Sequence, residues 1–268
     1  MSPPPTDLPL SHDPAPRPPV YSRVRRHLTA DVREDMLLEA QLLLLVFATG
    51  VQDATTFPDY HCFAGNQTGN TVLIAVGAAG VGAGVFSIHN IGISLAAFVL
   101  GGWSTGQIGH LAGCRSRWWL LLTSSLQTVL VFVAAALQFR AGVAGITDDT
   151  ALGVIALLAF SSGGEVAVAR GLQMAEITTA MATAAYVNIA ADRRLFVWPN
   201  RLRNRRALFL LSLLLGSLVG AITYSRLGSP FALLISAIGK LAVTTAFCFN
   251  KEVEEGNMSM LEPGHRKT

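Results

Sequence analysis

Two acidic side chains lie in or beside apolar stretches of this sequence, where a charged group is energetically unfavourable. Asp53 ends the first apolar stretch, and Glu165 lies deep in a later one. An ionisable residue at the centre of a membrane span costs about 2.5 to 3.5 kcal/mol on insertion scales. Asp53 could bind a proton or a cation, or it could cap the turn that follows. Glu165 could couple to a proton, or it could make a buried structural hydrogen bond.

Neutral polar residues and a glycine cluster near these acids. Gly69 permits close backbone approach, and Asn66, Thr68 or Asn70 could cap the next helix, whose first amides would then attract an anionic group. Together these features predict a substrate-binding pocket, and its candidate residues are Asp53, Gln52, Asn66, Thr68, Gly69, Asn70, Glu165, Gln173 and Thr179.

Other kinds of site find little support. The histidines, including His89 and His110, have no further ligand at metal-site spacing, and the three cysteines lack a CxxC pair. No nucleophile triad or phosphate-binding glycine loop is present. The sequence therefore predicts no metal, no cofactor and no enzymatic activity. The net charge of +3 comes from basic residues beside apolar stretches and does not indicate nucleic-acid binding.

The elements that would position these residues are long apolar stretches. The chain is 51% hydrophobic and 14% charged, against about 25% charged residues in soluble domains. A run of about 20 apolar residues spans the roughly 30 Å of a bilayer's hydrocarbon core. Six strong stretches are expected to span, at residues 37–53, 88–112, 118–139, 151–171, 207–224 and 230–250. The chain is therefore predicted to be an all-α, polytopic integral membrane protein in contact with lipid.

Two weaker, threonine-bearing segments, residues 66–86 and 176–191, are expected to be short or re-entrant helices. If both enter and leave on one face, Arg115, Arg117, Arg170 and the arginines of residues 193–206 share the cytoplasmic side with both tails. This arrangement satisfies the positive-inside rule better than eight full crossings. Six full crossings plus two short helices are therefore predicted, in an unspecified membrane.

The order of elements occurs twice along the chain. Gly50-Val51-Gln52-Asp53-Ala54 and Gly171-Leu172-Gln173-Met174-Ala175 each end a span, and each precedes a weak segment and two further spans. With three crossings per half, the halves (36–140 and 151–250) would be inverted copies. Such repeats are common in secondary transporters, although chance similarity of a short string is the alternative.

The regions outside the membrane domain, 36–250, are predicted to be tails. Residues 1–35 are proline-rich and then basic, which indicates a disordered cytoplasmic tail, and residues 251–268 form a second one. Residues 193–206 contain six arginines and Trp198, and are interpreted as a topology anchor or as a site for lipid headgroups or an anionic ligand. Glycines spaced by four, such as Gly216 and Gly220, favour helix packing, with homo-oligomer contacts as the alternative.

Two motifs in the first half resemble a known family. Gly50-Val51-Gln52-Asp53-Ala54 and the later Phe63-Ala64-Gly65-Asn66-Gln67-Thr68-Gly69-Asn70 are similar to the signature of the YoaK family, also called the domain of unknown function 1275. Gln67 replaces the usual Met, and Met174 and Ala184 depart from the family's second block. The resemblance covers about residues 36–250. It implies a multi-pass helical membrane protein whose family has no established activity.

The function predicted from these features is transport of a small solute or ion, with proton coupling through Asp53 or Glu165. The chief alternative is a membrane scaffold or regulator in which the polar residues only hold helices together. A membrane-embedded enzyme ranks third, because no catalytic constellation is visible.

Overall fold

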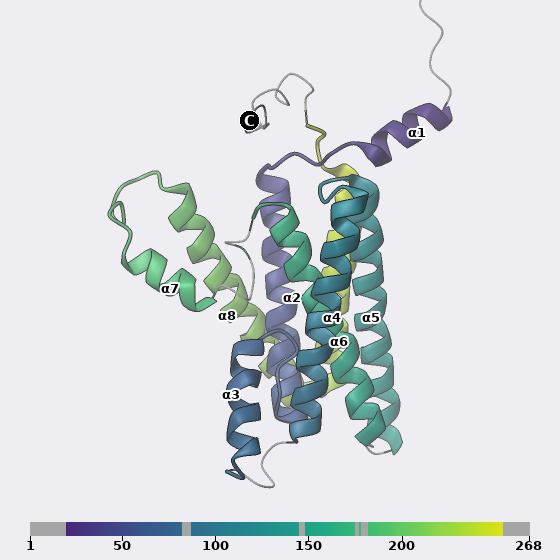
Figure 1. The fold of residues 1–268 in the computed structure, drawn as a ribbon, viewed down its shortest axis with the longest axis vertical. Helices are drawn as coiled ribbons and strands as arrows, with labels where there is room; N and C mark the ends of the chain where they lie inside the picture. The colour runs from purple at the N-terminus through teal and green to yellow at the C-terminus, as the bar shows by residue number, and fades with distance from the viewer. Residues whose placement is uncertain (1–19, 82–86, 145–147, 175–176, 178–181, 254–268) are drawn as a thin grey trace, which may run out of the picture.

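The structure, a computed structural model, describes residues 20–81, 87–144, 148–174, 177 and 182–253. Nearly all of these residues belong to helices, which form an upright bundle (Figure 1). In chain order the α-helices are α1 (Val20–Thr29), α2 (Met36–Tyr60), α3 (Gln67–Ala78), α4 (Ile88–Ala112), α5 (Arg117–Ala144), α6 (Asp148–Gly171), α7 (Ala182–Ala190), α8 (Arg201–Leu227) and α9 (Ser229–Ala246), which a short 3-10 turn, Phe247–Phe249, follows.

Six of these helices are long and apolar enough to cross a membrane: α2, α4, α5, α6, α8 and α9. At 1.5 Å per residue, a helix of 20 residues covers about 30 Å, and all six predicted spans fall within these helices apart from a few terminal residues. The chain is an all-α, multi-pass membrane protein, as predicted.

Contacts at the two ends of the bundle fix the direction of each helix. Before α2, Asp31 forms a β-bridge with Ser116, which precedes α5, and Val32 forms one with Glu252, which follows α9. We call this end the terminal face, because both described ends of the chain lie there (Figure 1). The two described ends of the chain, Val20 and Val253, therefore lie at the same end of the bundle, whereas the side and compartment of the two tails stay predictions.

The other end, which we call the opposite face, is held together by Asp59 near the end of α2. Its carboxylate accepts hydrogen bonds from Gln138 of α5 (2.7 Å), from the Tyr224 hydroxyl of α8 (2.9 Å) and from Ser229 at the start of α9. Consecutive long helices consequently alternate in direction between the two faces.

The two short helices return to the face from which they came. α2 ends at the opposite face, and α4 begins there too, since Asn90 donates to the Tyr60 carbonyl. α3 therefore starts and finishes without crossing. α6 ends beside Cys114 at the terminal face, where Arg205 near the start of α8 pairs with Glu34 at 2.5 Å. α7 is accordingly re-entrant from that face, so six crossings plus two short helices describe the fold.

Three predicted boundaries are wrong. α2 continues to Tyr60 instead of ending at Asp53, whose carboxylate lies inside the helix and accepts a hydrogen bond from the Gly65 N–H. α8 begins at Arg201, where Asn200 caps it, so four of the six arginines assigned to a loop are helical. Residues 20–29, predicted as disordered tail, form the basic amphipathic helix α1, while residues 1–19 lie outside the described residues.

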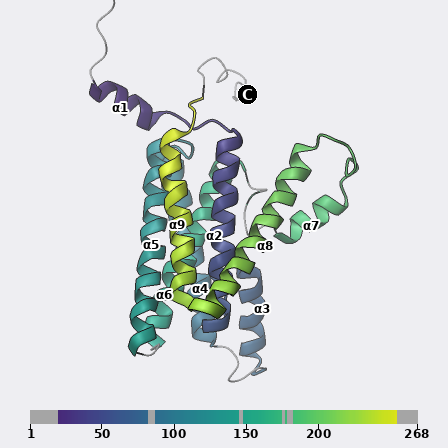
Figure 2. The ribbon, with the colours of Figure 1, turned by 180° about the vertical axis from the view of Figure 1, so that it is seen from behind.

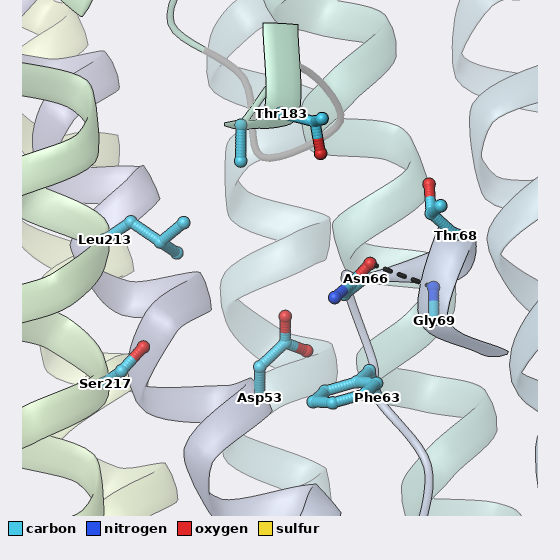
Figure 3. A pocket seen from close by; sticks show the side chains of 9 residues that line it. Asp53, Phe63, Asn66, Thr68, Gly69, Thr183, Leu213 and Ser217 are labelled. Carbon is cyan, nitrogen blue, oxygen red and sulfur yellow. Dashed lines mark hydrogen bonds between the residues drawn. The ribbon is translucent and has the colours of Figure 1, made fainter. Parts of the chain in front are cut away.

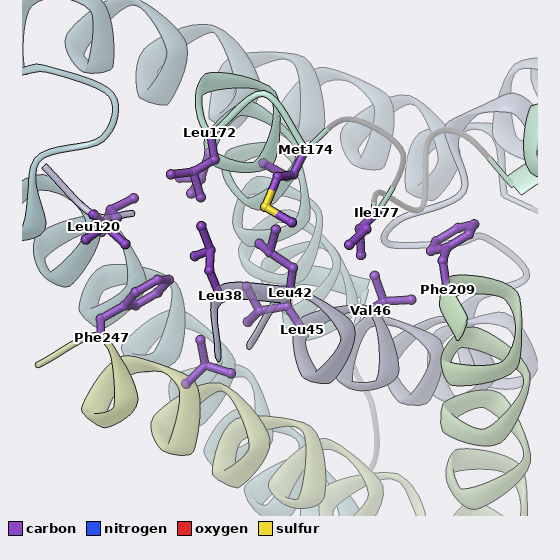
Figure 4. Packing of buried hydrophobic residues seen from close by; sticks show 14 of the residues in the cluster. Leu38, Leu42, Leu45, Val46, Leu120, Leu172, Met174, Ile177, Phe209 and Phe247 are labelled. Carbon is purple, nitrogen blue, oxygen red and sulfur yellow. The ribbon is translucent and has the colours of Figure 1, made fainter. Parts of the chain in front are cut away.

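Apolar side chains fill the bundle near the terminal face (Figure 4). They come mainly from α2, α5, α6, α7, α8 and α9, from the segment that follows α6, and from the 3-10 turn that follows α9. The buried members with the largest side chains are Leu38, Leu42, Leu120, Leu172, Met174, Phe209 and Phe247. This cluster anchors the two helices, α2 and α8, that later form one wall of the candidate site.

Glycines allow two pairs of helices to touch backbone to backbone. A Cβ atom on Gly163 of α6 would lie 2.0 Å from the Phe98 carbonyl oxygen of α4, and one on Gly216 of α8 would lie 2.1 Å from the Phe47 carbonyl oxygen of α2. By contrast, a Cβ atom on Gly106 would meet nothing within 4 Å. The packing role predicted for the small residues is thus realised at some of them and not at others.

Candidate functional site

A cavity of about 320 Å³ lies where the first turns of α3 and α7 approach α2 and α8. Its lining combines one carboxylate with amide, hydroxyl and apolar groups: Asp53, Phe63, Asn66, Thr68, Gly69, Ala182, Thr183, Leu213 and Ser217. Figure 3 shows Asp53 between Ser217 and Leu213 on one side and Phe63 and Asn66 on the other. The α2 and α3 residues of the lining are more than 100 positions from the α7 and α8 residues, so the cavity is a product of the tertiary fold.

α2 places Asp53 inside the bundle rather than at its end. Asp53 lies seven residues before the end of α2, which corresponds to about 10 Å along the helix. The chain that follows α2 folds back by this distance, because Asp53 Oδ1 accepts a hydrogen bond from the Gly65 backbone N–H at 2.7 Å. The side chain therefore both anchors the returning segment and contributes a carboxylate to the cavity.

The returning segment delivers the start of α3 to the cavity. Asn66 is the N-cap, and its side chain accepts from the Gly69 N–H at 3.2 Å. This confirms the predicted capping role for Asn66. Phe63 stacks on Phe57 of α2, with ring centroids 4.7 Å apart. The first turn of α3 is thereby held with its amide end facing the cavity.

Asn70 holds the returning segment in place from the interior of the protein. It is fully buried, accepts from the Phe63 N–H at 2.9 Å, and donates to the Phe63 carbonyl at 2.8 Å and to Ser94 Oγ of α4 at 3.1 Å. All of these bonds connect the returning segment to α3 and α4. Asn70 is thus a structural neighbour of the cavity and does not line it.

The opposite wall comes from the second half of the chain. Thr183 is the second residue of α7, and Ser217 lies in the middle of α8. In the described part of the chain, the side-chain hydroxyls of Thr68, Thr183 and Ser217 form no hydrogen bond with protein groups. Three hydroxyl groups around the cavity are consequently available to a small polar ligand.

Glu165 lies outside the cavity and has a partner that the sequence analysis missed. Lys240 of α9 donates to Glu165 Oε2 at 2.5 Å, and Thr49 of α2 donates to Oε1 at 3.1 Å. Lys240 is 1% exposed and Glu165 is 7% exposed. A lone lysine within an apolar stretch is itself a signal of a buried partner, and it could have identified this pair.

The other predicted residues fall in different places. Gln52 is buried about one turn along α2 from Thr49, donating to Ser236 Oγ at 2.8 Å and accepting from Ser162 at 3.4 Å. Gln173 is exposed just after α6, with a φ of 60°. Thr179 lies outside the described residues. Of the nine predicted residues, the cavity therefore unites Asp53, Asn66, Thr68 and Gly69.

Five lining residues were absent from the predicted set: Phe63, Ala182, Thr183, Leu213 and Ser217. Thr183 carried a signal, because it occupies the place of Thr68 in the repeated order of elements. Leu213 and Ser217 carried none, since only the packing of α8 on α2 brings them to the site. Among the described residues, no group of three or more His, Cys, Asp or Glu side chains is arranged to hold a metal ion.

A comparison with known protein families shows to which of them the chain is related. A family model described as a protein of unknown function (DUF1275) matches residues 41–246, which is more than half of the chain. The chain belongs to the DUF1275 family. The match runs from the second turn of α2 to the end of α9, so the DUF1275 region includes every residue of the cavity and leaves out α1. No curated protein and no solved structure matches the chain.

Proposed function

We propose that this DUF1275 protein is a secondary transporter of a small polar solute, with the cavity between α2, α3, α7 and α8 as its binding site. The observation that carries the proposal is a polar cavity inside the membrane domain, lined by the Asp53 carboxylate and by three hydroxyl groups that form no hydrogen bond within the described residues. A polar, hollow interior costs stability in a membrane protein, so a function is the simplest reason to retain one.

The size of the cavity supports a small ligand. Ligand pockets usually measure about 300 to 1,000 Å³, and 320 Å³ lies at the low end of that range. One carboxylate can balance a cationic group or a proton. The first turns of α3 and α7 offer partial positive charge and hydroxyl donors to an anionic or neutral polar group.

The positions of α3 and α7 support transport rather than simple binding. Each is a short helix that begins beside the cavity and returns to the face from which its segment entered, α3 to the opposite face and α7 to the terminal face. Broken helices that meet at a central site from both sides are a recurring feature of transporters built from inverted repeats. In such proteins, one half moves against the other and exposes the site to each side in turn.

Reciprocal backbone contacts support an inverted repeat. α4 of the first half contacts α6 of the second, with the Gly101 Cβ position 2.2 Å from the Phe160 carbonyl oxygen. Reciprocally, α8 of the second half contacts α2 of the first, with the Gly216 Cβ position 2.1 Å from the Phe47 carbonyl oxygen. The motifs Phe47-x-x-Gly50 and Phe160-x-x-Gly163 thus take equivalent roles in the two contacts.

Reciprocal hydrogen bonds favour the same correspondence. Thr49 of α2 donates to Glu165 of α6, and Ser162 of α6 donates to Gln52 of α2. Thr49 therefore corresponds to Ser162, and Gln52 corresponds to Glu165. This register pairs Gly50 with Gly163, instead of the pairing with Gly171 that the sequence strings favour.

Asp53 is a better candidate than Glu165 for the carboxylate that couples transport to proton movement. Lys240 neutralises Glu165 within the bundle, so Glu165 already has a permanent counter-ion. Asp53 forms no ion pair within the described residues, and it faces the cavity. A proton or a cationic group of the substrate would therefore bind at Asp53.

The experiment uses purified full-length protein in proteoliposomes that contain the pH-sensitive dye pyranine. External amino acids, short carboxylates and polyols are added one at a time. The proposal predicts that at least one compound moves protons inward, that Asp53→Asn abolishes this movement, and that Thr71→Val preserves it. Thr71 lies one turn along α3 and does not line the cavity. Absence of proton movement with every compound would favour the scaffold alternative.

A further inference from the structure

The connector between α7 and α8, residues 191–200, is tied together at its base. The Asp192 carboxylate accepts from the Arg194 backbone N–H at 2.8 Å and from the Asn200 side chain at 2.7 Å, and these bonds lower the pKa of Asp192. Asn200 in turn caps α8 by accepting from the Arg203 N–H at 3.1 Å. The connector is thus an ordered structure with a defined outer surface.

The outer surface of the connector is aromatic. Phe196 is 95% exposed and Trp198 is 86% exposed, although both lie between residues that take part in the hydrogen bonds of the base. The Arg203 side chain donates to the Leu195 and Val197 carbonyls on either side of Phe196. The Asp192 carboxylate and the Leu195 and Val197 carbonyls are therefore bonded within this region, and the two rings project outward.

The arginines of this region differ in whether they form ion pairs. Arg201 and Arg205 pair with Glu39, and Arg205 also pairs with Glu34. Arg193 and Arg194 are exposed and form no ion pair in the described part of the chain. Two free positive charges therefore stand beside the two projecting rings.

The connector lies where the membrane surface must be. α8 crosses the bilayer and begins at Arg201, directly after the connector, on the terminal face. Figure 2 shows α7 and the first part of α8 leaning away from the other helices, with the connector at their outer end. Nothing in the described chain covers the rings there. Lipid headgroups of the adjacent leaflet are therefore the molecules expected to surround these two rings.

We propose that the connector binds anionic phospholipid, with Phe196 and Trp198 in the interfacial region and the phosphate groups against Arg193 and Arg194. Tryptophan and other aromatic rings are favoured at headgroup depth, where an apolar body and a polar edge are both satisfied. Each arginine near an anionic surface contributes roughly a five-fold preference, so the two arginines predict up to about twenty-five-fold local enrichment of anionic lipid. The partner is thus a negatively charged leaflet, not an acidic protein.

The test measures quenching of Trp198 fluorescence by brominated lipids in nanodiscs that contain the full-length protein. The chain has four tryptophans, so the Trp198 signal is the difference between the parent protein and Trp198→Phe. Discs contain phosphatidylcholine and phosphatidylglycerol in equal amounts, and only one of the two lipids is brominated in each sample.

We expect both lipids to quench Trp198, with quenching by brominated phosphatidylglycerol at least about two-fold greater. The double variant Arg193→Gln/Arg194→Gln should remove this difference and keep the quenching by phosphatidylcholine. The control Arg33→Gln/Arg170→Gln loses the same charge from exposed arginines elsewhere on the terminal face and should behave like the parent. If neither lipid quenches Trp198, the connector does not lie in the membrane surface and the proposal is overturned; an acidic protein partner would give this result. Equal quenching by the two lipids in the parent would also overturn it.

Discussion

Lys240 Nζ donates to Glu165 Oε2 at 2.5 Å in a part of the bundle where both side chains are almost completely buried. The pair joins α9 to α6, and the hydrogen bond from Thr49 adds α2 to the same cluster. A paired charge in a low-dielectric interior is tolerated, whereas either partner alone would be an uncompensated charge. This relationship assigns Glu165 a structural role and leaves Asp53 as the carboxylate that faces the cavity.

Removing only Lys240 should therefore destabilise the protein strongly. Lys240→Met leaves Glu165 buried without a counter-ion, which predicts a loss of about 3 to 5 kcal/mol in the free energy of unfolding. The double variant Glu165→Gln/Lys240→Met should recover most of this loss, because no unpaired charge remains. Thermal unfolding in detergent measures both. A Lys240→Met variant as stable as the parent would contradict the assigned pairing.

The close backbone contact between α4 and α6 predicts a sharp difference between two glycines. Gly163→Ala places a methyl group 2.0 Å from the Phe98 carbonyl oxygen, so the helices must separate at a cost of about 1 to 3 kcal/mol or more. Gly106→Ala meets nothing within 4 Å and gains helix propensity. Unfolding midpoints of the two variants should move in opposite directions. Similar losses in both would refute the contact.

The returning segment before α3 predicts unequal effects of two asparagines. Asn66→Ala removes an exposed N-cap and should cost about 1 kcal/mol. Asn70→Ala leaves the Phe63 N–H without its acceptor, at about 1 to 3 kcal/mol, and also removes the hydrogen bonds from Asn70 to the Phe63 carbonyl and to Ser94, which keep their bond to each other. Hydrogen exchange at residues 61–66 should rise much more in Asn70→Ala. Equal exchange in the two variants would show that Asn70 does not hold the segment.

Asp53 has two roles that substitutions can separate. In an Asp53→Asn variant, the amide oxygen of the new side chain can still accept from the Gly65 N–H, so the free energy of unfolding should change by no more than about 1 to 2 kcal/mol. Asp53→Leu loses the acceptor as well and should loosen the start of α3. Proton movement should be absent in both variants. Normal proton movement in a folded Asp53→Asn protein would remove Asp53 from the coupling step.

Much of the fold could be predicted because a membrane span is recognisable as a run of about 20 apolar residues. Six apolar stretches and the distribution of arginines were enough to predict six crossings and two short helices. Helix boundaries were less predictable where a local bond overrides composition. Asp53, taken as the end of the first span, lies inside α2 and accepts from the Gly65 N–H, and Asn200 caps the start of α8 within an arginine-rich stretch.

The candidate site was predictable only on the side of α3. Asp53, Asn66, Thr68 and Gly69 are close in sequence, so their clustering follows from local structure. Ser217 and Leu213 reach the cavity because Gly50 and Gly216 let α8 touch α2, and this contact depends on residues more than 160 positions apart. Glu165 was placed in the site because its partner, Lys240, was overlooked.

The central claim is that the cavity beside Asp53 is open to water. The direct measurement is labelling of single introduced cysteines on α8 by the charged thiol reagent MTSET in proteoliposomes, counted above the labelling of the parent protein. Ser217→Cys lines the cavity, and Leu214→Cys lies on the lipid-facing side of the same helix, 65% exposed. The account predicts rapid labelling of Ser217→Cys and little labelling of Leu214→Cys. Equally low labelling of both would mean a dry interior, and it would contradict the proposed transport site.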